Sequence, residues 1–105
     1  MPDLLSSLKE WHERKSPLLV ERGVKVGIFE SPEGRDKNSF GISFELGSRI
    51  SYLTAWDSGE IQISSIDLDT DSAPKEEYRE NVPAGDLPVI ADRLASWVFR
   101  ISRNS

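Results

Sequence analysis

The side chains best able to do chemistry in this chain are the carboxylates of one short stretch. Asp67, Asp69 and Asp71 alternate along the sequence, a spacing that calcium loops with oxygen ligands also use. A loop of the EF-hand type that began at Asp67 would need glycine at its sixth position and glutamate at its twelfth, which here are Ser72 and Tyr78. A metal site is therefore the least favoured interpretation. A solvated strand end and a surface that meets a basic partner both remain open.

The sequence lacks the common residue patterns that mark a catalytic site. There is no cysteine, which excludes thiol catalysis, disulfides and zinc held by thiolates. The one histidine, His12, falls on the expected solvent side of a helix, whereas a general base needs a buried or partnered setting. There is no Gly-x-Ser-x-Gly and no glycine-rich phosphate loop. Paired carboxylates formally allow a glycosidase, but 105 residues leave little chain for a substrate cleft. We expect a protein that acts by binding, with no cofactor.

The acidic residues are concentrated in the second half of the chain. Residues 1–56 carry eight basic and eight acidic side chains, whereas residues 57–92 carry two basic and ten acidic ones, which leaves −8. Such a field repels phosphate backbones, so we expect no nucleic-acid partner. It would accelerate encounter with a basic protein. The alternative is that acidity only keeps a small protein soluble.

Length and composition indicate one globular domain over residues 1–105. Hydrophobic residues make up 37% of the sequence and there are 3 Trp, 2 Tyr and 4 Phe, which is too apolar for a disordered chain. No apolar run approaches the roughly 18 residues that span a bilayer. The first residues also lack the basic-then-apolar pattern of an export signal. We therefore expect a cytoplasmic protein with no membrane partner.

Apolar residues at helical spacing predict a helix near each end of the chain. The first covers residues 4–16 after Asp3 as its N-cap. Pro17 then either kinks this helix or starts a second short helix that Gly23 ends. The second predicted helix covers residues 87–102, with Asp86 as its N-cap, Pro88 in its first turn, and an apolar stripe of Leu87, Ile90, Leu94, Trp97 and Ile101.

Alternating apolar residues predict four strands between the two helices. We place them at residues 24–28, 40–46, 49–56 and 60–68, and we read 31–38 and most of 69–85 as loops. The inward face of the third strand is ambiguous, because Ile50, Tyr52, Thr54 and Trp56 oppose Leu53 and Ala55. A bulge at Ser64–Ser65 would bring Ile61, Ile63, Ile66 and Leu68 to one face. The prediction is an α+β fold: a four-stranded antiparallel β-meander flanked by an N-terminal and a C-terminal amphipathic helix, with Trp11 and Trp97 in the core.

Four segments of the chain also resemble a known family in their order and spacing. They are Ser7-Leu8-Lys9-Glu10-Trp11, Glu21-Arg22-Gly23-Val24-Lys25-Val26, Ser31-Pro32-x-Gly34-Arg35 and Leu53-Thr54-Ala55-Trp56-Asp57-Ser58-Gly59. Over residues 5–70 the chain is similar to the small TriTu-like immunity proteins encoded beside Rhs-type polymorphic toxins of bacteria. The resemblance implies a toxin partner that is an ADP-ribosyltransferase domain acting on elongation factor Tu.

If the resemblance holds, the acidic stretch and the hairpin before it should face the toxin. Tyr78 would be an exposed anchor, and Trp56 would be either a second anchor or a core residue. We expect a monomer in a 1:1 complex with the toxin domain; the alternative is an acidic adaptor or chaperone-like protein for a secretion substrate or larger complex. The predicted contact residues are Trp56, Asp57, Glu60, Asp67, Asp69, Asp71, Glu76, Glu77 and Tyr78.

Overall fold

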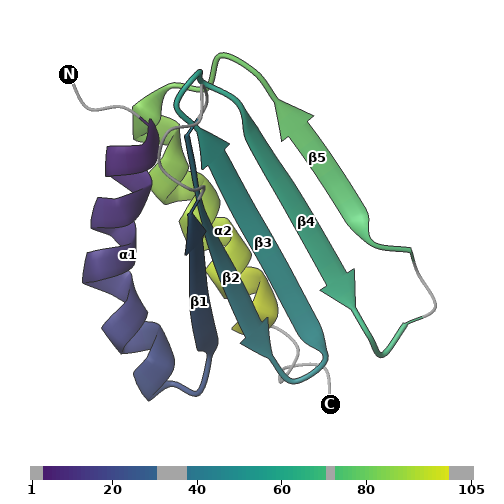
Figure 1. Ribbon diagram of the computed structural model, residues 1–105. Helices are drawn as coiled ribbons and strands as arrows, with labels where there is room; N and C mark the ends of the chain where they lie inside the picture. Colours follow the sequence, from purple (N-terminus) through teal and green to yellow (C-terminus); the bar gives the residue numbers. More distant parts are fainter. Residues whose placement is uncertain (1–3, 31–37, 71–72, 100–105) are drawn as a thin grey trace.

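Five antiparallel strands, joined in chain order, form one sheet in the computed structural model, and both helices lie on the same face of it (Figure 1). The structure describes residues 4–30, 38–70 and 73–99. Asp3, Asp71, Ile101 and all but the last residue of the predicted 31–38 loop lie outside these ranges. The elements are α1 (Leu4–Glu21), β1 (Lys25–Glu30), β2 (Ser39–Leu46), β3 (Arg49–Trp56), β4 (Ile61–Asp67), β5 (Lys75–Arg79), the 3-10 turn η1 (Ala84–Asp86) and α2 (Leu87–Phe99).

The α+β class and the antiparallel meander are confirmed, but the prediction of four strands is wrong. β5 occupies part of the stretch that the sequence analysis assigned mostly to loop, and it pairs with β4 from Ile61↔Arg79 to Ser65↔Lys75. Its five residues include four charged ones and none of the aliphatic residues that mark a buried strand. Backbone pairing with β4 therefore defines β5, and the apolar pattern could not reveal it.

The register of β3 with β4 shows whether the predicted bulge exists and which face of β3 is buried. Pairing continues without interruption from Arg49↔Asp67 to Ala55↔Ile61, so the predicted bulge is wrong. Ile66 consequently lies on the face opposite Ile61, and Leu68 is exposed beyond the end of the strand. Ser51, Leu53 and Ala55 are the buried residues of β3, which places Trp56 on the face away from the helices.

The core lies between the helices and the inner face of β1 to β4. Trp11 is buried as predicted and packs edge-on against Phe44, with ring centres 5.6 Å apart. Its Nε1 donates a hydrogen bond of 2.9 Å to Asp92 Oδ1 on α2, which joins the two helices. The buried apolar side chains of the strands are Phe40, Ile42, Phe44, Leu53, Ala55, Ile61 and Ile63.

The helix boundaries agree in part with the prediction. α1 is one helix that runs through Pro17 to Glu21, so the alternative of a separate second helix is wrong. Gly23 follows with φ 96°, a left-handed conformation that suits glycine after a helix end. Pro88 is in the first turn of α2 as expected, directly after η1. In the described parts of the chain no helix is long and apolar enough to cross a membrane.

Candidate functional site

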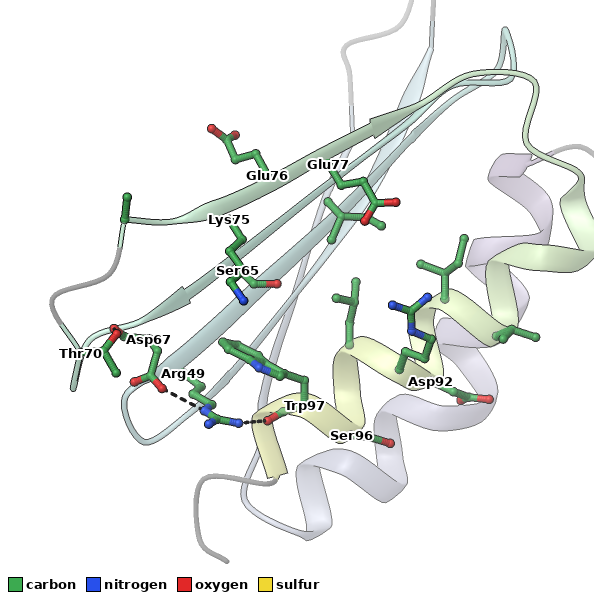
Figure 2. A pocket seen from close by; sticks show the side chains of 16 residues that line it. Arg49, Ser65, Asp67, Thr70, Lys75, Glu76, Glu77, Asp92, Ser96 and Trp97 are labelled. Carbon is green, nitrogen blue, oxygen red and sulfur yellow. Dashed lines mark hydrogen bonds and ion pairs between the residues drawn. The ribbon is translucent and has the colours of Figure 1, made fainter. Parts of the chain in front are cut away.

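The second half of the sheet extends beyond the helices. α1 packs on β1, β2 and β3, and α2 packs on β2 and β3. The inner face of β4 and β5 is therefore separated from α2 by a groove of about 1070 Å³ (Figure 2). Ile63 and Glu77 line it from the sheet, and Val89, Arg93 and Trp97 line it from α2.

One end of the groove is closed by Arg49, which clamps α2 to the sheet. Its Nε contacts Asp67 Oδ2 at 3.1 Å, and its Nη1 donates a hydrogen bond of 2.8 Å to the carbonyl oxygen of Trp97 (Figure 2). The guanidinium carbon also lies 4.7 Å from the centre of the Trp97 ring, a cation–π contact. Trp97, which was predicted to lie in the core, is half-buried and packs against it. The sequence analysis did not identify Arg49 as its partner.

Asp67 is a partner of this clamp, and its surroundings favour the charged carboxylate. The backbone N–H of Asp69 donates to Asp67 Oδ1 at 3.0 Å, Ser48 Oγ donates to the same atom, and Arg49 contacts the other oxygen. The Asp69 N–H is the main cause that lowers the pKa of Asp67 below its ordinary value of 3.8, aided by Arg49 and Ser48 against the opposing effect of desolvation. Asp67 therefore has a structural role.

Five of the predicted contact residues share the outer face or the β3–β4 hairpin end of the sheet. Trp56 lies at the end of β3 on that face, and Asp57 is exposed in the turn, where it accepts hydrogen bonds from Asn38. Tyr78 on β5 pairs in register with Gln62 of β4 and is 55% exposed. The remaining two, which contact neighbours on this face, are Glu60, 3.5 Å from the Tyr78 hydroxyl, and Glu76, 3.1 Å from Gln62 Nε2.

The other predicted contact residues are elsewhere. Asp67 belongs to the clamp at the opposite end of β4, and Asp69 accepts a hydrogen bond of 2.9 Å from Ser48 Oγ. Glu77 is on the inner face in register with Ile63, forms an ion pair with Arg79, and lines the groove. Within the described ranges, the structure therefore divides the predicted surface into an outer-face part and a groove part.

Two aromatic residues that the sequence analysis did not select also lie on the outer face. Tyr52 is exposed on β3 and shares the parity of Trp56, the signal that would have found it. Phe29 on β1 is exposed too, and its ring covers Gly41, where an added Cβ would come within 2.0 Å of it. We define the outer aromatic face by Phe29, Tyr52, Trp56 and Tyr78. Exposed aromatic side chains of this kind are enriched in protein interfaces.

Possible metal ligands do not gather in one place within the described residues, and His12 lies beside an aromatic ring. No group of three or more histidine, cysteine, aspartate or glutamate side chains converges within them. His12, expected on the solvent side, is half-buried and lies edge-on to Phe40 with ring centres 6.3 Å apart. The outer face presents exposed aromatic and charged side chains, which suit recognition of a macromolecule.

Comparison with known proteins gives one match. No curated protein and no solved structure matches the chain. The family model described as "Immunity protein TriTu" matches residues 6–97, which extends past the recognised segments to include β5 and most of α2. The chain therefore belongs to the TriTu family of immunity proteins, a membership that indicates a toxin-neutralising role.

Proposed function

We propose that this protein binds and neutralises a cognate Rhs-type toxin domain, an ADP-ribosyltransferase, by covering its active site. Family membership supports the toxin-neutralising role. The chemistry of the toxin follows from the resemblance of the sequence segments to proteins encoded beside such toxins. One copy of this protein in the cytoplasm would meet one toxin domain, and inhibition would require binding alone.

The observation that carries the proposal is the outer face of the sheet, which no helix or strand of the described residues covers (Figure 1). Neither helix packs there, and the outer aromatic face meets the acidic side chains of Glu60 and Glu76 at its β5 side. Tyr78 stands between these two carboxylates with more than half of its surface exposed. A rigid aromatic residue surrounded by like charges is suited to anchor a complementary basic partner.

The charge of this surface agrees with the proposed target. An ADP-ribosyltransferase must hold the pyrophosphate of a dinucleotide, which favours a basic cleft. Trp56, Asp57, Glu60, Glu76 and Tyr78 form the proposed contact surface. Asp67 and Asp69 already contact Arg49 and Ser48 within the chain, so we assign them to stability of the fold.

A growth experiment tests the proposed function. The C-terminal domain of the toxin encoded beside this gene is expressed in bacteria with and without this protein. We expect the toxin domain to stop growth and this protein to restore it. A toxin domain that kills equally in both strains would contradict the proposal and favour the adaptor.

A single substitution then tests the proposed surface. Tyr78→Ala should weaken binding of the purified toxin domain by about tenfold or more, measured by calorimetry, because it removes an exposed aromatic anchor. Its thermal midpoint should be unchanged. Leu18→Ala is the matched control, because Leu18 is also 55% exposed but lies on α1. Equal affinity of the Tyr78 variant and the wild type would remove this surface from the proposal.

A further inference from the structure

The helices cover the two sides of the sheet differently. The strand order ends with β1 on one side and β5 on the other. α1 packs beside β1, whereas Figure 1 shows no element beside the outer edge of β5. Within the described ranges, β5 is paired with β4 alone. A strand edge of this kind presents a row of backbone donors and acceptors to which an extended segment of another chain can add.

Both faces next to this edge are also accessible. On the outer face a strand added to β5 would place alternate side chains beside Tyr78 and Glu76. On the inner face its other side chains would enter the groove between β5 and α2 (Figure 2). Val89, which lines this groove, is 60% exposed. An added strand would therefore gain side-chain contacts on both sides as well as backbone hydrogen bonds.

In the register centred on Glu77, the charges of β5 disfavour a second copy of this chain as the occupant. Antiparallel pairing of two β5 strands about Glu77 would set the two Glu77 carboxylates opposite each other and each Lys75 opposite an Arg79. Like charges directly opposite one another destabilise a strand pair. A different chain with basic residues on its outer side would instead meet Glu76 and Glu60 with complementary charge.

We propose that β5 accepts a sixth strand from the cognate toxin domain: an extended segment with basic side chains toward Glu76 and apolar side chains toward Val89 in the groove. This inference rests on the proposed function and specifies how the toxin is held. Part of the binding free energy then comes from backbone hydrogen bonds along β5, and the rest from pockets for alternate side chains.

Proline substitutions separate the backbone contribution from that of the side chains. Consecutive residues of an antiparallel strand direct their N–H groups alternately to the two neighbouring strands. Of Glu76→Pro and Glu77→Pro, one therefore removes a hydrogen bond to β4 and lowers the thermal midpoint, and the other removes a donor from the outer edge only. Glu76→Ala and Glu77→Ala are the matched controls for loss of each side chain.

We expect the proline variant with the wild-type thermal midpoint to bind the toxin domain at least about tenfold more weakly than its alanine control. In the wild-type complex, amide hydrogen exchange across Lys75–Arg79 should slow by a similar factor. Equal affinity of the proline and alanine variants would overturn strand addition, as would unprotected β5 amides if both prolines unfold the protein. If either of these results were found while this protein still restored growth, strand addition would be overturned and the proposed function would remain supported. Absence of any binding by the wild type would overturn both.

Discussion

The two halves of the sheet differ in what holds them together. On β2 and β3 most inner side chains are apolar and both helices pack on them, so burial of Phe40, Ile42 and Phe44 stabilises the structure. In β5 every side chain is exposed or half-exposed and four of five are charged. The difference indicates that stability is concentrated in the helix-covered half, which leaves the uncovered half available for recognition.

Polar side chains of β3 lie at the boundary between the two halves of the sheet. Arg49 links the end of β3 to β4 through Asp67 and to the last turn of α2 through the Trp97 carbonyl. Ser51, two residues further along β3, is fully buried. Substitutions at these positions, together with one in each half, test whether stability is concentrated in the helix-covered half.

The largest loss of stability is expected in the covered half. Phe44→Ala should lower the free energy of unfolding by about 3–5 kcal/mol, because it leaves a cavity beneath Trp11. Urea unfolding followed by tryptophan fluorescence would measure it. Tyr78→Ala, the aromatic control in the uncovered half, should change stability by less than about 0.5 kcal/mol. Similar losses of unfolding free energy for Phe44→Ala and Tyr78→Ala would contradict a concentration of stability in the helix-covered half.

The second-largest loss of stability is expected at Arg49, which joins α2 to the sheet. Arg49→Ala should lower the free energy of unfolding by about 2 kcal/mol, because the Trp97 carbonyl and the Asp67 carboxylate lose a charged donor together. Arg49→Lys keeps the charge but has only one ammonium group for two acceptors, and it should fall between the wild type and the alanine variant. A lysine variant as stable as the wild type would show that charge alone suffices.

A gain of stability is expected at Ser51. Its hydroxyl is buried opposite Phe44 and finds no hydrogen-bond partner among the described residues. Ser51→Ala should raise the free energy of unfolding by about 1 kcal/mol, because a buried unpaired polar group is costly. Ser43→Ala on the outer face of β2 is the control, with an expected change under about 0.5 kcal/mol. Loss of stability at Ser51 would indicate that the hydroxyl does have a partner.

The smallest expected effect on stability is at Asp67 and is confined to acid conditions. The pKa of Asp67 is lower in the folded chain than its ordinary value of 3.8, so this carboxylate contributes stability above that value. The contribution is lost as the pH falls through the lower, folded-state pKa. Asp67→Asn should therefore show a shallower loss of stability below pH 3.8 in a series of urea titrations. Ser48→Ala removes the weaker contact to Asp67 at 3.2 Å, along with the contact to Asp69, and leaves the Asp69 N–H and Arg49 in place, so it should retain most of the wild-type slope.

Much of the covered half could be predicted from residue types along the chain. The spacing of Leu4, Leu8 and Trp11 indicated α1, and the alternation from Phe40 to Leu46 indicated β2 with its inner face. Short polar links between apolar runs indicated the antiparallel meander. These patterns are readable because burial demands apolar side chains at the period of the helix or strand.

The uncovered half and the candidate site depended on tertiary structure. β5 has no apolar period, in keeping with the absence of a helix packed on it in the described part of the chain, and its backbone pairing with β4 leaves no signature in residue type. The orientation of Trp56 followed only from the register of β3, and the partner of Arg49 on α2 is 48 residues away along the chain. The residue pattern was sufficient for the buried stripes of the two helices and of β2. The inner face of β3, and the polar and aromatic groups that lie together on the exposed surfaces, depended on the fold, because their neighbours come from distant parts of the chain.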